Sequence, residues 1–180
     1  MPSPVGHTLG ALSVGWAIAR PAATRRALLV QASIFAAIGS APDLDLLIGR
    51  HSRETHSLGA AVIAATVAAA WRWPIADTRA RIFLAALCAW FSHPMMDALS
   101  PDTSAPIGVM IMWPFSREHW LTGWALFWPI WRDIHSSKFF SHNSGAVLRE
   151  LAIMLPVTAL VWWTRRRRSA VSVRLPRAGE

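Results

Sequence analysis

The chain has 180 residues, 53% of them hydrophobic and 16% charged, which suits one domain with a sizeable core rather than two. Soluble domains carry about a quarter charged residues, and Trp, present eleven times, favours membrane–water interfaces. The composition therefore indicates a membrane protein. A net charge of +8 would also suit nucleic acid, but the basic residues cluster between apolar runs and in the run 165–168. That placement fits a topology signal or anionic lipids better, so nucleic-acid binding is not expected.

Five apolar segments rich in Ala, Leu, Ile and Met predict helices, at 8–19, 27–41, 57–71, 81–96 and 147–164. Each segment is shorter than the roughly 20 helical residues that are needed to cross a bilayer core of about 30 Å. The prediction is an all-α, polytopic membrane helical bundle with about five membrane-embedded helices, some of them half-embedded. A soluble all-α protein with buried helices is the alternative on segment length.

A sixth segment, 118–131, carries four tryptophans at helical spacing: Trp120, Trp124, Trp128 and Trp131. This spacing predicts an interfacial helix with an aromatic face, and a helix packed on its neighbours is the alternative. Residues 1–164 are expected to form a single membrane-embedded domain. Residues 165–180 are expected to be a basic, disordered cytoplasmic tail.

The distribution of arginine predicts how the bundle is oriented. If the first segment begins outside the cytoplasm and the next three cross in turn, twelve of the eighteen Lys and Arg lie inside, as the positive-inside rule requires. The expected location is the inner (cytoplasmic) membrane, in a multi-pass topology.

Under this topology the outer face receives ligand-type residues from four consecutive segments. They are His7 in the first, Asp43 and Asp45 after the second, His51 and His56 before the third, and His93 and Asp97 at the end of the fourth. A lone His on an apolar helix is more often structural than a ligand. Several carboxylates and imidazoles together in an apolar protein are costly unless they are paired or bind a metal. The conjunction therefore predicts a metal site on the outer face.

His93 and Asp97 are spaced i,i+4, so one helix face would carry both, although Pro94 opens or bends that turn. Thr55 is expected to cap a helix that starts at His56. Mixed His and carboxylate ligands suit one or two ions of Zn²⁺, with Mn²⁺ or Fe²⁺ as alternatives. Three histidines without partner spacing are expected to be structural, with one of them as an alternative third-metal ligand: His119, His135 and His142.

These motifs together resemble a known family. They are Gly6-His7, Pro42-Asp43-Leu44-Asp45, His51 with Arg53, Thr55-His56-Ser57, Ser92-His93 with Asp97, and Trp113-Pro114. In this order they resemble the YdjM-like, inner-membrane-associated metal-dependent hydrolases, a family also described as LexA-binding. The resemblance runs from about residue 5 to residue 116. It implies hydrolase chemistry without naming a substrate.

A more remote resemblance, to the all-α zinc-dependent phospholipase C and nuclease group, implies how the ligands divide. His7 and Asp97 would hold one metal, and Asp43, His56 and His93 would hold a second, with Asp97 bridging. A metal-activated water would then attack a phosphoester, with Asp45 or Asp43 as general base. Arg53 and Arg117 are candidates to clamp the anionic substrate, and contact with lipid headgroups is their alternative role. Asp102 is expected to be a turn residue.

The expected function is therefore a membrane-bound metal-dependent hydrolase that cleaves a lipid-like phosphoester. Its expected partners are membrane lipids and this substrate. One alternative is a non-catalytic regulator or scaffold with a structural metal, which binds a cytoplasmic protein through the basic tail. A transporter is another alternative, but ligands gathered at one face disfavour it, because an ion path needs them near the middle of the membrane.

Overall fold

The computed structural model describes residues 1–103 and 105–174, without the side chains of 168–174. The described residues contain five α-helices, two short 3₁₀ helices and no strand, so the all-α prediction is confirmed. The elements are α1 (Pro4–Ile18), α2 (Arg25–Ser40), η1 (Ala41–Ile48), η2 (Glu54–His56), α3 (Leu58–Ala70), α4 (Arg79–Ala98) and α5 (Phe139–Arg174).

Each of the first four helices begins at a hydroxyl residue that caps it. The side chains of Ser3, Thr24, Ser57 and Thr78 accept hydrogen bonds from the first-turn backbone N–H groups of α1, α2, α3 and α4. Such caps satisfy donors that have no partner inside the helix. The expectation that Thr55 caps a helix at His56 is wrong. His56 ends the 3₁₀ turn η2, and α3 starts one residue after the cap Ser57.

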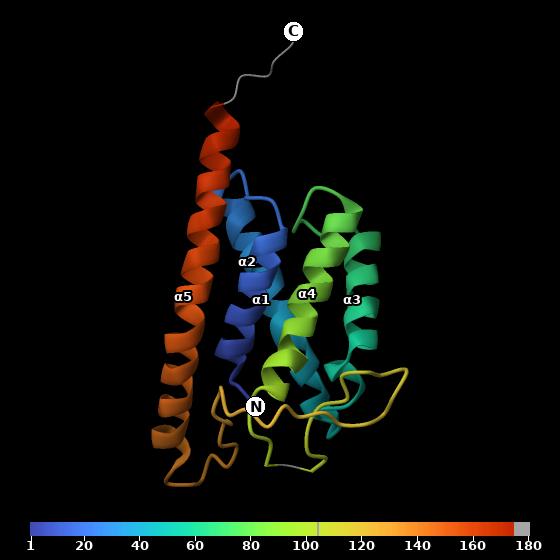
Figure 1. The fold of residues 1–180 in the computed structure, drawn as a ribbon, viewed down its shortest axis with the longest axis vertical. Coiled ribbons are helices and arrows are strands. Elements are labelled where there is room, and N and C mark those ends of the chain that lie inside the picture. Colours follow the sequence, from blue (N-terminus) through green and yellow to red (C-terminus); the bar gives the residue numbers. More distant parts are fainter. Residues whose placement is uncertain (104, 175–180) are drawn as a thin grey trace.

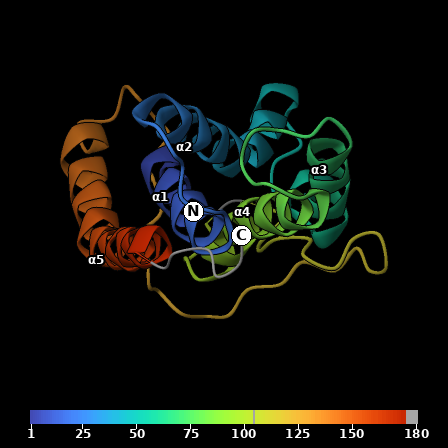
Figure 2. The same cartoon turned by 90° about the horizontal axis from the view of Figure 1, so that it is seen from above.

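The helices run alternately up and down, so that their ends gather in two places (Figure 1). The N-terminal end of the bundle holds the start of α1, the η1–η2 connection, the end of α4 and the segment 99–138. The arginine end is opposite and holds Arg20, Arg25, Arg26, Arg72, Arg79, Arg81 and the arginines late in α5. Seen from above, α1 and α4 lie at the centre, with α2, α3 and α5 around them (Figure 2).

Small side chains form much of the core. Buried alanines on α1, α3 and α4, among them Ala11, Ala65 and Ala89, let the helices approach closely, and Phe35 and Ile82 fill the space between them. Close packing of small residues is typical of helices that associate in a membrane. α1 packs on α2, α4 and α5, and α3 packs on α4.

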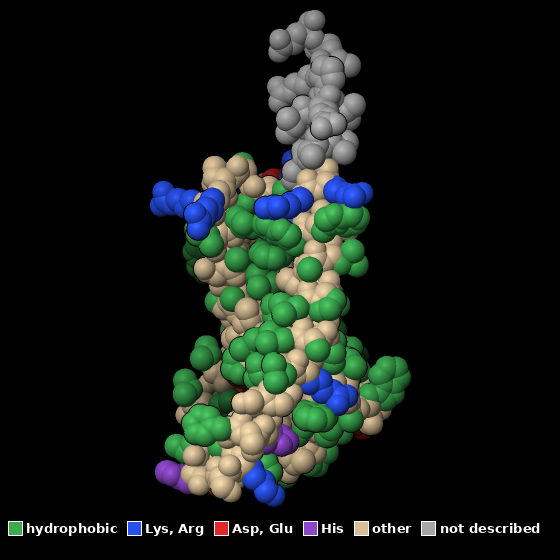
Figure 3. Space-filling view, turned by 90° about the vertical axis from the view of Figure 1, so that its left-hand side faces the viewer, with side chains coloured by type: hydrophobic (Ala, Val, Ile, Leu, Met, Phe, Trp, Pro, Cys, Tyr) green, Lys and Arg blue, Asp and Glu red, His purple; other side chains and the backbone are tan. Residues whose placement is uncertain are grey.

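Two helical stretches are long and apolar enough to cross a membrane, judged by length and composition: Arg25–Ile48 and Phe139–Arg167. Leu58–Ala70 is apolar but shorter. At about 1.5 Å per residue, helices the length of α1 and α3 do not reach across a core of about 30 Å. The expected number of about five membrane-embedded helices is therefore not confirmed. Figure 3 shows hydrophobic side chains between Lys and Arg groups near the two ends of the molecule.

The interfacial helix expected over 118–131 is wrong, because the segment is irregular. Its backbone groups bond elsewhere: Trp120 pairs with Val109 in a single β-bridge, and the N–H groups of Thr122 and Leu126 donate to Ala98 and Leu99 at the end of α4. Gly123, with φ +76°, turns the chain away from a helical path. The four tryptophans remain exposed by 41–68%.

No helix ends where the domain boundary was expected, after residue 164, because α5 continues to Arg174. Arg165 is buried, and its Nη2 donates to the carbonyl of Arg20 and to Oε1 of Gln31. Residue 165 therefore belongs to the packed bundle. Residues 165–174 are helical, and 175–180 lie outside the described part of the chain.

Candidate metal centre

Four elements bring the predicted ligands together at the N-terminal end of the bundle. His7 lies in the first turn of α1, Asp43 in η1, His56 in η2, and His93 and Asp97 near the end of α4. α4 stays helical through Pro94 to Ala98, so His93 and Asp97 do share one face, one turn apart. The gathering of residues ninety positions apart in the chain, predicted from helix order, is present in the structure.

Four ligand atoms from three of these elements converge on one point. The Nε2 atoms of His56 and His93 are 3.1 Å apart. Asp43 Oδ1 lies 3.6 Å from the former and 3.5 Å from the latter. Asp97 Oδ2 lies 3.6 Å and 3.2 Å from the same two nitrogens.

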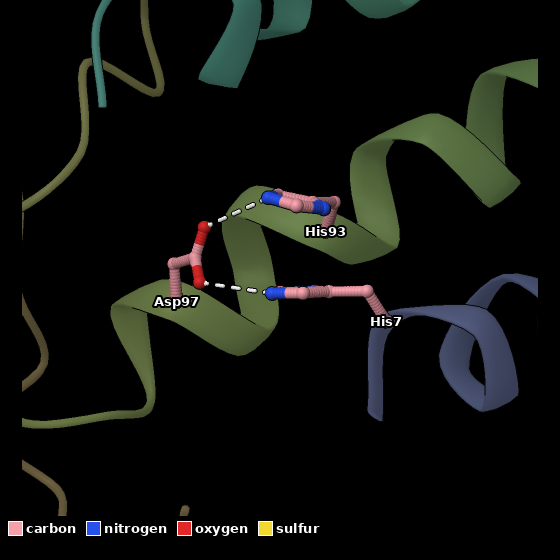
Figure 4. A group of neighbouring side chains, drawn as sticks. All are labelled: His7, His93 and Asp97. Carbon is pink, nitrogen blue, oxygen red and sulfur yellow. Dashed lines mark ion pairs between the residues drawn. The ribbon is translucent and has the colours of Figure 1, made fainter. Parts of the chain in front are cut away.

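His7 approaches Asp97 from the other side. Its ring stacks on that of His93 with centroids 3.6 Å apart, and its Nε2 lies 3.3 Å from Asp97 Oδ1 (Figure 4). The Asp97 carboxylate thus turns one oxygen to His93 and the other to His7. Within the described residues, both ring nitrogens of His7 and both Asp97 oxygens are buried without a hydrogen-bond partner of proper geometry. Such atoms are costly unless something else, such as a cation, satisfies them.

The His93 ring is fixed by the backbone of α2. Its Nδ1 lies 2.6 Å from the carbonyl oxygen of Gly39, so Nδ1–H donates and Nε2 keeps a free lone pair toward the cluster. The close approach of α2 to α1 requires Gly at position 39. A Cβ there would lie 2.7 Å from the carbonyl oxygen of His7 and 2.6 Å from Cβ of Ala11.

Asp45 lies behind His56 rather than among the converging atoms. Its Oδ2 is 3.1 Å from Nδ1 of His56 and accepts a hydrogen bond from Thr55 Oγ1, while its Oδ1 is 3.1 Å from Nδ1 of His51. A carboxylate on the outer nitrogen of an imidazole typically orients a metal-binding histidine. Burial lowers the pKa of His56, but the carboxylates of Asp43 and Asp45 raise it, and the net pKa lies above its ordinary value.

His51 lies at the edge of the cluster. Its Nδ1 is 3.7 Å from Asp43 Oδ1, and its Nε2 accepts a hydrogen bond from Nη2 of Arg132 at 2.8 Å. The sulfur of Met1 also contacts Nε2. Besides the four converging atoms, two groups of three described residues have ligand atoms that all lie within 4.8 Å of one another: His7, His93 and Asp97, and Asp43, His51 and His56.

Arg132 and Glu150 also contact this region, although neither was predicted from the sequence. Arg132 follows a tryptophan in an irregular segment and carries no motif. Glu150 had a signal, since it is a carboxylate inside the apolar segment 147–164. It is fully buried and accepts hydrogen bonds from Ser3 N at 2.6 Å, from Gly6 N at 3.1 Å and from the Ser3 hydroxyl. It therefore holds the start of α1, one turn from His7.

The remaining candidates lie outside the cluster. The Arg53 side chain is exposed, and its carbonyl accepts the N–H of His56; Arg117 is also exposed. Asp102 accepts a hydrogen bond from the N–H of Gly108, six residues later, and does not itself lie in a turn. His119, His135 and His142 belong to neither set of three described residues that could share an ion, and the ring Nε2 of His142 donates to the carbonyl of Pro129.

The donor set fits a small divalent cation. In a tetrahedral site with ligands about 2.0–2.2 Å from the ion, neighbouring donors lie about 3.3–3.6 Å apart. The four converging atoms are separated by 3.1–3.6 Å in the pairs described above. Nitrogen and carboxylate oxygen are donors that Zn²⁺, Mn²⁺ and Fe²⁺ accept. The side chains of His7, His56, His93 and Asp97 are 0–1% exposed, whereas that of Asp43 is 22% exposed. The centre is therefore open only on the side of Asp43.

Comparison with known proteins adds the family. No curated protein and no solved structure matches the chain. The model of the family described as YdjM inner membrane protein matches residues 1–173, well beyond the span of 5–116 over which the motifs were recognised. The chain therefore belongs to the YdjM inner membrane protein family.

Proposed function

We propose that this protein is a membrane-bound metal-dependent hydrolase that cleaves a phosphoester of a lipid-like substrate. The observation that carries the proposal is the convergence of two imidazole nitrogens and two carboxylate oxygens within 3.1–3.6 Å, beside buried polar atoms of His7 and Asp97. The ligands are His7, Asp43, His56, His93 and Asp97. They would hold one or two ions, and the two oxygens of Asp97 face His7 and His93. Zn²⁺ suits them best, with Mn²⁺ or Fe²⁺ as alternatives.

A divalent ion in this position supplies Lewis acidity and lowers the pKa of water toward neutrality. The water oxygen bonds to phosphorus while the ester P–O bond breaks. We assign the proton to the pair of Asp45 and His51. Asp45 Oδ1 holds Nδ1–H of His51. Nε2 of the same ring accepts a hydrogen bond from Arg132 in the structure, and it would take the proton from water and return it to the leaving oxygen once that guanidinium turns to the phosphate. Asp45 then acts through His51, and it also positions His56.

The open side of the centre supports catalysis over a purely structural metal. A structural site is closed by its protein ligands, whereas a catalytic site keeps a position for water or substrate. Here Asp43 is the exposed ligand, and it lines a pocket of about 430 Å³.

We also propose a multi-pass topology in which the metal centre faces outward from the inner membrane. The arginine end supports this orientation, because basic residues favour the cytoplasmic side. Because Ser52 is buried, the outward probe is placed at the exposed position 53: single cysteines at 53 and 170, on a Cys88→Ser background, should be labelled by an impermeant maleimide in intact cells at 53 only. Labelling at 170 alone would reverse the orientation.

The function is tested on protein purified in detergent. Metal analysis should find bound ion, and a panel of aryl and lipid phosphoesters should include a substrate whose hydrolysis stops with chelator and returns with Zn²⁺ or Mn²⁺. If metal-replete protein hydrolyses no phosphoester, carboxylester or amide, the proposed enzymatic activity is ruled out and only the proposed metal site remains. A regulator or scaffold with a structural metal would then be the better description.

A further inference from the structure

A pocket of about 430 Å³ opens beside the metal centre, between η1, the start of α1 and the segment 129–133. Asp43 is the ligand that lines it, in keeping with the exposure of that side chain. The volume lies in the range that holds a small organic ligand. The pocket therefore reaches the centre at Asp43.

One side of the pocket is cationic. Arg132 is the one basic side chain among the described residues that line it. Its guanidinium touches Nε2 of His51 at 2.8 Å, and Nδ1 of the same ring lies 3.7 Å from Asp43 Oδ1. The guanidinium is thus one imidazole ring away from the open side of the centre. A guanidinium donates two parallel hydrogen bonds to phosphate oxygens, which a compact ammonium does not.

The rest of the wall is mostly apolar: Pro2, Pro4, Leu46, Pro129, Ile130 and Trp131. Hydrophobic side chains at the same end are strongly exposed, with Leu47 at 83% and Phe115 at 82%. Exposed apolar surface of this kind marks contact with a membrane or another apolar partner. The lining holds three acidic residues: the ligand Asp43, and Asp102 and Asp133, which accept backbone N–H groups of Gly108 and His135.

We infer that this pocket is the substrate site, that Arg132 anchors the phosphate group, and that the apolar wall takes the chain attached to it. The substrate class is a phosphoester carried by an apolar chain. This inference rests on the proposed function for the hydrolytic step. The inferred binding of the substrate rests on the pocket, and it can be measured separately from hydrolysis.

The test is titration calorimetry of the purified, Zn²⁺-supplemented protein with two soluble, non-hydrolysable probes, hexylphosphonate and methylphosphonate. Hexylphosphonate should bind at least about tenfold more tightly than methylphosphonate, because its longer chain buries more methylene groups. Arg132→Ala should lower the affinity for both probes by about tenfold or more. The affinity of Arg132→Lys should lie between those of Arg132→Ala and the unchanged protein. Leu46→Asn, at a half-exposed position, should weaken hexylphosphonate alone.

Arg50→Ala is the matched control, since Arg50 lies at the same end but pairs with Glu54 at 2.7 Å. It should bind both probes as the unchanged protein does. Metal content, measured for every variant, should be unchanged. Equal binding of the two probes, no binding of either, or undiminished binding in Arg132→Ala would overturn the inference.

The same variants separate this inference from the proposed function. If Arg132→Ala still hydrolyses the substrate with an unchanged KM, the pocket is not the substrate site, but the proposed hydrolase function stands. If the protein binds hexylphosphonate selectively and through Arg132 but hydrolyses no ester, the pocket is a binding site and the proposed hydrolase function is ruled out.

Discussion

Two carboxylates are fully buried near the start of α1, and their surroundings differ. Glu150 is surrounded by donors: the backbone N–H groups of Ser3 and Gly6 and the Ser3 hydroxyl. Asp97 faces the Nε2 atoms of His7, His56 and His93, and its oxygens lack a partner of proper hydrogen-bond geometry among the described residues. Both acids come from helices that pack on α1. Glu150 completes a helix end, whereas Asp97 belongs to a group of lone pairs that a cation would complete.

Burial of an acid therefore does not identify a binding site by itself. A carboxylate that accepts several N–H or O–H donors is satisfied by the protein and stabilises the fold. A carboxylate opposite imidazole nitrogens, one of which is fixed as an acceptor by Gly39, needs a proton or a metal. This difference predicts distinct outcomes when each acid is changed.

The largest effect is expected at the metal cluster. Asp97→Ala and His56→Ala should each lose bound metal and all hydrolytic activity, because each removes a donor from the converging group, while the protein stays inserted and folded. Elemental analysis of the purified variants measures the bound metal, and far-UV circular dichroism measures whether they are folded. His142→Ala, whose ring bonds to the Pro129 carbonyl, should keep its metal. Full metal occupancy in both cluster variants would remove the assignment.

The next effect separates holding the metal from handling a proton. Asp45→Asn should cut turnover by about 10²-fold or more, since the amide no longer holds the His51 imidazole as the carboxylate does. Metal content should stay close to that of the unchanged protein, because Asp45 is outside the converging group. Steady-state kinetics beside elemental analysis is the measurement. Loss of metal in proportion to loss of turnover would make Asp45 a ligand.

A smaller effect is expected at the helix end. Glu150→Gln should lower the free energy of unfolding by about 1.5–3 kcal/mol, since it weakens charge-assisted hydrogen bonds to the start of α1. Thermal unfolding in detergent gives the shift, and the exposed Glu118→Gln is the control. Metal added in excess should still bind. Complete loss of metal with unchanged stability would mean that Glu150 belongs to the cluster.

The smallest effect is a pH dependence of metal affinity. The pKa of His56 lies above its ordinary value, so the ion must displace a proton from this ring at lower pH. Affinity should fall by about tenfold per pH unit below this raised pKa. Competition with a chelating dye across pH measures the transition. In Asp45→Asn the transition should move to lower pH, because one carboxylate that raises the pKa is gone. A transition unmoved by this change would contradict the pairing of Asp45 with His56.

The sequence predicted the meeting of the ligands because they occupy matching ends of consecutive helices, which an up–down bundle must bring together. The same reasoning failed over 118–131. Helical spacing of tryptophans says nothing about Gly123 or about the carbonyls at the end of α4 that draw the backbone away. Arg132 could not be found either, since an irregular segment has no periodicity that aims a side chain. Glu150 could have been found as a charge inside an apolar helix.

The contact between Ser3 and Glu150 also links the site to the order of synthesis, because 147 positions separate the two residues. A nascent chain that has reached the end of α4 already contains every proposed metal ligand. The first turn of α1 still lacks its carboxylate at that stage, so the His7 backbone is not yet held in place. The acid arrives only with α5, the last of the described helices to be synthesised. A chain interrupted before α5 would therefore carry all the proposed ligands without the carboxylate that holds the start of α1.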